Sequence, residues 1–216
     1  MDTYVTLQQI DEAADVIRSR TSFKPRVGLI LGSGLNALAD SVQNADFIPY
    51  ADLPNWPRST VHGHTGRLVI GELEGQPVLV MQGRVHFYEG YSMSQVTLPV
   101  RVMVRLGLEM MIVTNAAGGI NPDFAPGDVM LITDNLNLVG MSGANPLMGP
   151  NIDELGPRFP DMSRAYDPEL MEKARKVAIE SKLSLREGVY CGLSGPSFES
   201  PADLRFFQYI RVKFSS

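Results

Sequence analysis

The feature that most limits the possible folds is a short apolar run that ends in a glycine-rich turn. Val27-Gly28-Leu29-Ile30-Leu31 contains no polar side chain, and Gly32-Ser33-Gly34 stops it. A strand that is apolar on both faces needs both faces covered, which is typical of a largely parallel sheet with helices packed on it. The run therefore predicts a buried strand in an α/β fold.

The rest of the chain alternates between similar apolar runs and helical patterns. Further strands are expected at 67–73, 77–81, 110–114, 129–133 and 188–193. Helical spacing of apolar residues predicts helices at 7–17, 35–42, 95–106 and 168–182. Glu74-Gly75 joins two of the strands and predicts a hairpin, so the sheet should be mixed.

No internal repeat and no linker with a shift in composition interrupts the 216 residues. We therefore expect residues 1–216 to form a single α/β domain, with a central mixed β-sheet flanked by helices. The stretch 140–160 is rich in glycine, proline and asparagine and exceeds the usual length of a connection. Such a loop is expected to be functional or to be held by a partner subunit.

Composition excludes several classes of protein. Hydrophobic residues make up 44% and charged residues 20%, which excludes a disordered chain. A net charge of −5 disfavours a nucleic-acid partner. No apolar stretch approaches the roughly 18 residues of a membrane span, and the N-terminus lacks a basic signal region. Cys191 is the single cysteine, so no disulfide can form within the chain, and we expect a buried thiol and a cytoplasmic protein.

Four segments that follow expected strands carry unusual chemistry. Active sites of α/β sheets lie at the carboxyl ends of their strands, where a Ser-Gly turn offers N–H groups and a hydroxyl to an anion. The segments are Gly32-Ser33-Gly34, residues 83–90, residues 114–119 and residues 194–199.

The segment 83–90 points to phosphate beside a hydroxylated ligand. Arg84 is a permanent cation with a bidentate fork, and His86 lies on the same side two residues later if the segment is extended. Tyr88 continues that face. The alternative is an ion-paired surface arginine beside a histidine and a tyrosine at the edge of the core.

Near the C-terminus, Phe198 and Glu199 suit a flat heterocycle, because a ring offers a stacking face and a carboxylate accepts hydrogen bonds. Ser200, Pro201 and Asp203 are also a typical helix start, and both interpretations are compatible.

The sequence disfavours two other kinds of site. Gly32, Gly34 and Ala37 fit a dinucleotide-binding pattern, but its acidic partner, Asp52, lies in an expected loop rather than at the end of a second strand. The three histidines, His62, His64 and His86, form a poor zinc site, because no cysteine lies nearby and the flexible Gly63 separates the first two. We expect no metal.

Five segments together resemble the trimeric, low-molecular-mass purine nucleoside phosphorylases. They occur in the family's order over residues 25–210 and are Leu31-Gly32-Ser33-Gly34-Leu35, Gly63-His64, residues 82–90, residues 114–119 and residues 195–199. The resemblance implies a phosphorylase/hydrolase-like fold, a homotrimer, and a pentosyltransferase of purine salvage. Its reaction is phosphate-dependent cleavage of purine nucleosides, with inosine and guanosine favoured, and it needs no cofactor.

The resemblance also implies roles for individual residues. The phosphate-binding residues would be Ser33, His64, Arg84, His86 and the Ala116 N–H. Tyr88 would contact the ribose, Phe198 the base, and Glu199 the N1–H of a 6-oxopurine, with His86 and Glu199 as catalytic residues. Phe159 would reach the ribose pocket of a neighbouring subunit.

Relatives of this kind continue past the helix that begins near Pro201. We expect residues 211–216 to diverge from the family, and the chain to lack the family's C-terminal strand and helix and several site residues. The alternative function is therefore a truncated, catalytically incompetent nucleoside-binding or dominant-negative subunit.

Overall fold

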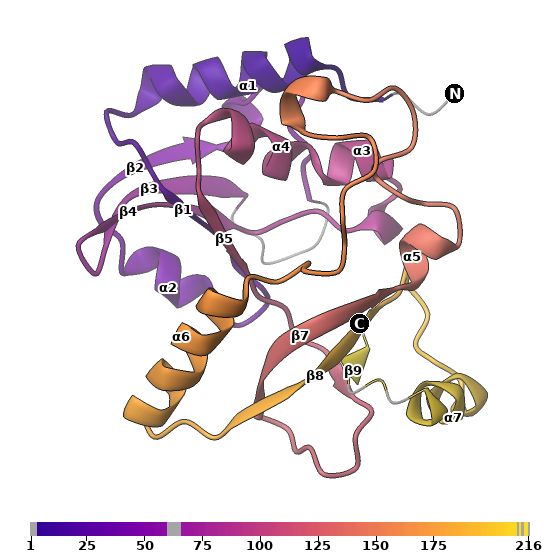
Figure 1. The fold of residues 1–216 in the computed structure, drawn as a ribbon. Coiled ribbons are helices and arrows are strands. Elements are labelled where there is room, and N and C mark those ends of the chain that lie inside the picture. The colour runs from indigo at the N-terminus through magenta and orange to yellow at the C-terminus, as the bar shows by residue number, and fades with distance from the viewer. Residues whose placement is uncertain (1–3, 60–65, 211, 213, 216) are drawn as a thin grey trace. The chain divides into compact units, whose positions relative to one another are not determined.

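The computed structural model describes residues 4–59, 66–210, 212, 214 and 215. Contacts divide the chain into two compact units, residues 1–116 with 146–158, and residues 117–145 with 159–216 (Figure 1). Each unit contains one sheet.

The first unit is built on a five-stranded mixed sheet. In pairing order its strands are β2 (Gln43–Pro49), β3 (Arg67–Leu73), β4 (Gln76–Gln82), β1 (Val27–Ile30) and β5 (Met110–Val113). Strand β1 lies between β4 and β5 and is parallel to both, whereas β3 is antiparallel to β2 and β4. Glu74 and Gly75 join β3 to β4 with φ of 49° and 70°, as a type I′ hairpin turn requires, so the predicted hairpin is confirmed.

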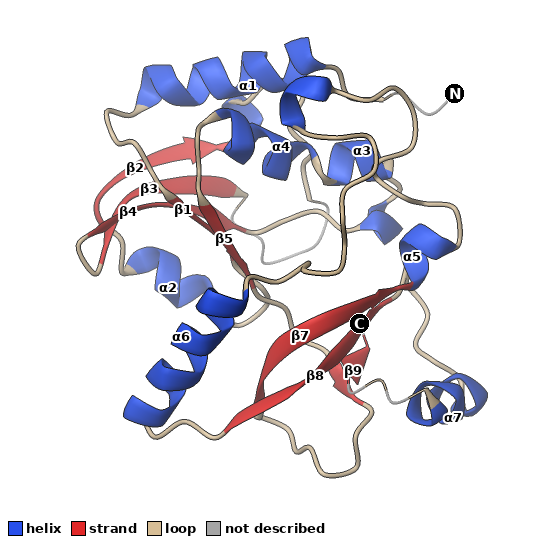
Figure 2. Ribbon diagram, viewed as in Figure 1, coloured by secondary structure: helices blue, strands red, loops and turns tan. Residues whose placement is uncertain are grey.

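Helices cover both faces of this sheet. They are α1 (Leu7–Arg20), α2 (Asn36–Asp40), α3 (Met93–Val96) and α4 (Leu98–Arg105), with 3₁₀ helices η1 (Tyr50–Asp52), η2 (Phe87–Glu89) and η3 (Asp153–Leu155). Figure 2 shows α1 and α4 on one side of the sheet and α2 on the other.

Alternation along the strands produces two apolar cores. Leu68 and Ile70 of β3 pack in the core that contains α1 and α4, whereas Val69 packs with Ala39 of α2 on the opposite face. Since successive side chains of a strand point to opposite faces, a strand that is apolar throughout contributes to both cores.

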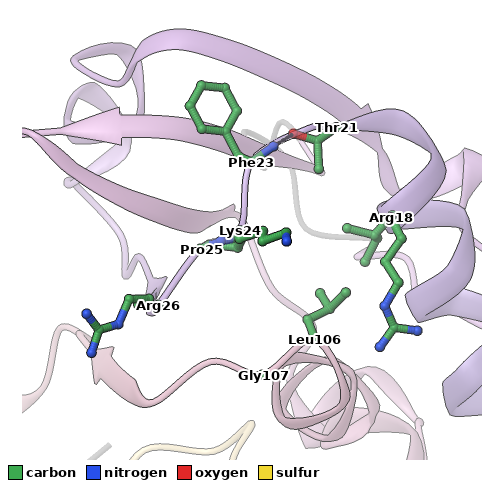
Figure 3. A pocket seen from close by; sticks show the side chains of 9 residues that line it. Arg18, Thr21, Phe23, Lys24, Pro25, Arg26, Leu106 and Gly107 are labelled. Carbon is green, nitrogen blue, oxygen red and sulfur yellow. Dashed lines mark hydrogen bonds between the residues drawn. The ribbon is translucent and has the colours of Figure 1, made fainter.

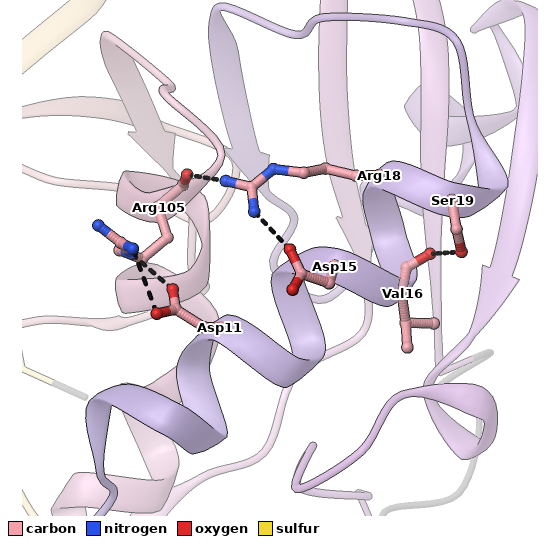
Figure 4. Close-up of polar contacts among 6 residues, drawn as sticks. All are labelled: Asp11, Asp15, Val16, Arg18, Ser19 and Arg105. Atoms are coloured by element: carbon pink, nitrogen blue, oxygen red, sulfur yellow. Dashed lines mark hydrogen bonds and ion pairs between the residues drawn. The ribbon is translucent and has the colours of Figure 1, made fainter.

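Helix α1 begins with a reciprocal pair of hydrogen bonds. Thr6 Oγ1 accepts the Gln9 N–H at 3.3 Å, and Gln9 Oε1 accepts the Thr6 N–H at 2.9 Å. Along the helix, Asp11 accepts two hydrogen bonds from Arg105 of α4, and Asp15 accepts one from Arg18 at 2.7 Å (Figure 4). The contact between Asp11 and Arg105 joins α1 to α4, whereas that between Asp15 and Arg18 lies within α1.

Replacing Thr6 with alanine should lower the free energy of unfolding by about 1 kcal/mol, because the first turn of α1 loses its cap. Urea denaturation monitored by circular dichroism measures this change. Thr6→Ser keeps the hydroxyl and should restore most of the loss. Equal stability of the alanine and serine variants would show that the cap contributes nothing.

Residues 146–158 of the long stretch pack on the first unit. Ile152 and Leu155 contact the core beneath α1 and α4, and Arg101 donates to the Pro146 carbonyl at 2.8 Å. Arg158 donates to the carbonyls of Leu147 and Gly149 at 2.7 and 2.8 Å. The chain's own first unit therefore holds this part of the loop.

The second unit has a four-stranded sheet. Its strands, in pairing order, are β6 (Gly118–Gly119), β9 (Phe214–Ser215), β8 (Leu185–Gly192) and β7 (Val129–Asn137). Strands β7, β8 and β9 are parallel, and β6 is antiparallel to β9. Its helices are α5 (Leu138–Met141), α6 (Pro168–Glu180) and α7 (Pro201–Tyr209).

A small core fixes α7 within the second unit. Cys191 is fully buried with Phe207 of α7 and with Ile120 and Val212, as predicted for an inert thiol. Burial raises the pKa of the Cys191 thiol, and the negative charge of Glu199 adds to the rise.

The α/β class and a mixed sheet flanked by helices are confirmed, while the single domain stays a prediction. The sequence predicted one sheet, whereas hydrogen bonding divides the strands between two. The predicted helix 95–106 is interrupted at Thr97, because Pro99 has no N–H to donate to the preceding turn. No helix in the described part of the chain is long and apolar enough to cross a membrane.

Candidate functional site

Three of the four predicted segments meet at one edge of the first sheet. Gly32-Ser33-Gly34 follow β1, Gly83 to His86 follow β4, and Thr114 to Ala116 follow β5. Because β1 is parallel to both neighbours, all three carboxyl ends lie at the same edge. Residues distant in sequence thus form a single group, which we call the carboxyl-edge cluster.

Ser33 occupies an exposed turn in this cluster. The Gly32 carbonyl accepts the Leu35 N–H at 3.3 Å, and Gly34 has a φ of 87°, a conformation that favours glycine. The Ser33 side chain is exposed at the tip. Its hydroxyl is therefore exposed at this edge of the sheet.

The Gly32 backbone lies directly against the segment that follows β5. Its N–H donates to Thr114 Oγ1 at 2.8 Å. A methyl group at this position would stand 2.6 Å from the Thr114 carbonyl oxygen and 2.7 Å from Asn115 Cα. Only glycine permits this close approach.

Arg84 lies beside the Ser33 turn. Its Nη1 donates to the Leu31 carbonyl at 2.9 Å, which brings the guanidinium to the end of β1. The preceding residue is fixed as well, because the buried Tyr50 hydroxyl donates to the Gly83 carbonyl at 2.7 Å. The structure therefore brings a permanent cation and a serine turn together, a pairing that suits an anion such as phosphate.

His86 and Tyr88 stack on one another, although the predicted extended segment is wrong at its end. Phe87–Glu89 forms the 3₁₀ helix η2, so Tyr88 does not continue a strand-like face. The two rings nevertheless lie 4.9 Å apart between centroids, with planes only 12° from parallel. The 3₁₀ turn places them together by winding the chain rather than by alternation.

Glu89 is a site residue that the sequence interpretation missed. Its side chain is only 2% exposed, and Oε1 accepts the His86 N–H at 2.7 Å and lies 3.2 Å from His86 Nδ1. Ser59 Oγ donates to the other carboxylate oxygen at 3.2 Å. A carboxylate at Nδ1 orients the imidazole and favours the tautomer whose Nε2 accepts a proton. The sequence contained a signal for this contact, because Glu89 follows His86 by three residues, which is the spacing of a helix-capping pair.

Of two further residues predicted to lie near phosphate, the structure describes Ala116 but not His64. Ala116 ends the cluster in an exposed position, and its carbonyl accepts a hydrogen bond from Asn115 Nδ2 at 3.1 Å. His64 lies outside the described residues.

The remaining predicted residues belong to the second unit. Phe198 and Phe159 are 96% and 87% exposed, and Glu199 is half-buried. Ser200 caps α7 in a reciprocal pair with Asp203, so the helix start predicted there is confirmed. The contacts of Phe198 and Glu199 with a base, and of Phe159 with a neighbour, stay predictions.

The dinucleotide alternative gains no support. Asp52 ends η1 and lies 3.8 Å from Arg20, in the connection after the antiparallel strand β2. A ribose-binding acid would instead end a parallel strand next to β1.

A cavity of about 380 Å³ lies at the other end of β1, between the end of α1, residues 21–26 and Leu106-Gly107 (Figure 3). Arg18, Lys24 and Arg26 line it. However, Arg18 pairs with Asp15, and Arg26 pairs with Glu109. With two of the three cations already neutralised, this cavity is a weaker anion site than the carboxyl-edge cluster.

Comparison with known proteins identifies relatives of this chain. The profile described as "Phosphorylase superfamily" matches residues 26–214, which is four residues past the expected end of the resemblance. The chain is 54% identical to purine nucleoside phosphorylase 1 of Geobacillus stearothermophilus over 199 residues, 92% of this chain and 72% of that protein. It is 46% identical to the purine nucleoside phosphorylase of Mus musculus over 212 residues, 97% of this chain and 73% of the relative.

Solved structures agree with the sequence matches. The crystal structure of isoform 2 of purine nucleoside phosphorylase from Schistosoma mansoni, in complex with cytosine and ribose-1-phosphate, superposes with a TM-score of 0.94 at 40% identity. It covers 100% of this chain, which spans 76% of that structure. The Schistosoma mansoni enzyme in complex with hypoxanthine has a TM-score of 0.94 at 39% identity, covering 99% of this chain and 76% of its own.

Proposed function

Because the chain belongs to the purine nucleoside phosphorylases of the phosphorylase superfamily, we propose that it cleaves purine nucleosides with inorganic phosphate. The products are the free base and ribose or deoxyribose 1-phosphate. The carboxyl-edge cluster carries this proposal, since it combines an exposed Ser-Gly turn, a fixed arginine and a stacked His-Tyr pair at one sheet edge. Phosphate is a co-substrate, and the reaction needs no cofactor.

The chemistry follows from where charge develops. The bond between C1′ and the purine nitrogen breaks and its electron pair leaves with the base, while a phosphate oxygen forms the new bond to C1′. The sugar gains oxocarbenium character, which an adjacent phosphate dianion stabilises. The departing base, which carries the electron pair of the broken bond, is neutralised by taking up a proton.

We assign the phosphate to the Ser33 hydroxyl, the Arg84 guanidinium and the Ala116 N–H. His86, oriented by Glu89, is assigned to the same anion, and His64 is expected nearby. Tyr88, stacked on His86, lies next to this group and is assigned to the ribose.

For the base, we assign Phe198 as the stacking face and Glu199 as the acceptor of N1–H. A carboxylate accepts from the protonated N1 of a 6-oxopurine but repels the lone pair at N1 of adenine. Inosine and guanosine are therefore the proposed substrates.

We also assign Phe159 to the pocket of a neighbouring subunit in a cytoplasmic homotrimer. An apolar ring that is 87% exposed, next to the anchored Arg158, suits such a contact. Size-exclusion chromatography with light scattering tests it, because Phe159→Ala should shift the assembly toward smaller species.

The decisive experiment is an inosine cleavage assay with and without phosphate. Hypoxanthine release that requires phosphate, with one ribose 1-phosphate formed per base, supports the proposal. Release without phosphate would identify a hydrolase. Nucleoside binding, measured by calorimetry, without any turnover would instead support the non-catalytic subunit. If the chain shows no binding and no turnover, both functions are excluded.

Replacing Glu89 with glutamine should lower kcat by about tenfold to a hundredfold, because an amide no longer favours a protonated Nδ1 and His86 loses its orientation. Steady-state kinetics across pH 5 to 9 measure the loss, and the acid limb of the profile should move. Glu74→Gln, in the exposed hairpin turn, is the matched control and should behave as wild type. An unchanged pH profile for the Glu89 variant would contradict the role.

A further inference from the structure

We propose that Thr114 is a positioning residue for phosphate, whose hydroxyl fixes the Ser33 turn relative to Ala116. The inference rests on the proposed function, because it concerns how the phosphate-binding groups are held. Thr114 itself does not touch the phosphate in this proposal. It acts by holding the Ser33 turn in place relative to Ala116.

The Thr114 hydroxyl joins two points of the chain at the end of β1. Oγ1 accepts the Gly32 N–H at 2.8 Å and donates to the Ile30 carbonyl at 3.2 Å. The Thr114 N–H also donates to that carbonyl, at 3.0 Å. The side chain therefore extends the pairing of β1 with β5 by one residue beyond the regular ladder.

This bridge directly ties the turn of Ser33 to the segment of Ala116, two of the three proposed phosphate donors. Ser33 follows Gly32 immediately, and Ala116 lies two residues after Thr114. Because Gly32 is buried, loss of the hydroxyl would leave its N–H without this acceptor in the interior, which is costly. A lost hydroxyl must be compensated by movement of the turn.

Arg84 supplies a separate restraint one residue earlier. It binds the Leu31 carbonyl, while the Leu31 N–H donates to Met81 of β4 at 3.3 Å. Leu31 is thus tied toward β4, and Gly32 is tied toward β5. Without Thr114 the turn keeps its link to Arg84 and loses its register with Ala116, so the three donors no longer converge on one anion.

Thr114→Val tests the bridge, because valine keeps the shape of threonine and removes the hydroxyl. We expect the dissociation constant for inorganic phosphate, measured by calorimetry, to rise by about tenfold, as for the loss of one buried hydrogen bond. The KM for inosine at saturating phosphate should stay within about twofold of wild type. Thr114→Ser restores the hydroxyl and should bind phosphate nearly as tightly as wild type.

The matched control is Thr97→Val, at a hydroxyl that donates to the Met93 carbonyl at 2.8 Å, away from the cluster. It should leave phosphate affinity unchanged. If Thr114→Val does not fold, Thr114→Ala removes the hydroxyl without crowding, and the alanine and serine variants should differ about tenfold in phosphate affinity.

Three outcomes would overturn the inference. Wild-type phosphate affinity in the valine variant would show that the bridge is dispensable, and the proposed function would stand. Equal weakening of phosphate and nucleoside binding would assign Thr114 a general structural role. Absence of phosphate binding by the wild-type chain would remove the proposed function itself.

Discussion

Replacing Arg84 with alanine should lower kcat/KM for phosphate-dependent nucleoside cleavage by about a thousandfold, because the proposed site loses its permanent cation. The same change removes the hydrogen bond to the Leu31 carbonyl at the base of the Ser33 turn. Initial rates over a series of phosphate concentrations measure the loss. Most of the loss should appear as a higher KM for phosphate, with little change in the KM for the nucleoside.

Arg84→Lys separates charge from geometry. Lysine keeps the charge but lacks the planar fork, so it cannot hold the Leu31 carbonyl and a phosphate together, and its activity should fall between wild type and alanine. Arg26→Ala is the matched arginine control, since Arg26 pairs with Glu109 at the opposite end of β1. Full activity in the alanine variant at position 84 would exclude the assignment.

Gly32→Ala should destabilise the fold by about 3 kcal/mol and abolish phosphate binding, because a methyl group there meets backbone rather than a movable side chain. The added carbon would lie 2.6 Å from the Thr114 carbonyl oxygen. Relief of this clash requires β1 and β5 to separate at the carboxyl-edge cluster. Urea denaturation and phosphate calorimetry measure the two effects.

Gly75→Ala is the appropriate comparison for that substitution. Gly75 has a φ of 70° in the hairpin turn, and nothing lies within 4 Å of an added methyl group. It should cost about 1 kcal/mol from backbone strain alone and leave phosphate binding intact. A loss at Gly32 no larger than that at Gly75 would contradict the predicted clash with Thr114, because, of the two, only Gly75 has a positive φ.

The sequence predicted those parts of the fold whose causes are local. The apolar run at 27–31, the Glu74-Gly75 hairpin and the start of α7 at Ser200 each depend on neighbouring residues, and each is present in the structure. Strand β2 was missed, since Gln43, Asn44 and Asp46 give its first half no apolar alternation. It forms by pairing with β3 at the edge of the sheet, which tolerates polar residues.

The site divides in the same way. Ser33 and Arg84 were predictable because they follow apolar runs and parallel strands bring their ends together. The contact of Thr114 with Gly32 could not be predicted, because the two residues are 82 positions apart and no sequence periodicity indicates such a contact. Glu89 had a local signal, yet its burial against His86 depends on the 3₁₀ turn at 87–89.

The position of β1 between β4 and β5 has a consequence for how the protein folds. The β3–β4 hairpin closes through a two-residue turn, whereas β1 must insert between β4 and β5, across long stretches of chain. Contacts of high sequence separation form slowly, so the phosphate-binding edge should be among the last parts to assemble. At the proposed site, phosphate would bind only the finished sheet and would stabilise it by mass action. Added phosphate should then raise the resistance of the protein to unfolding.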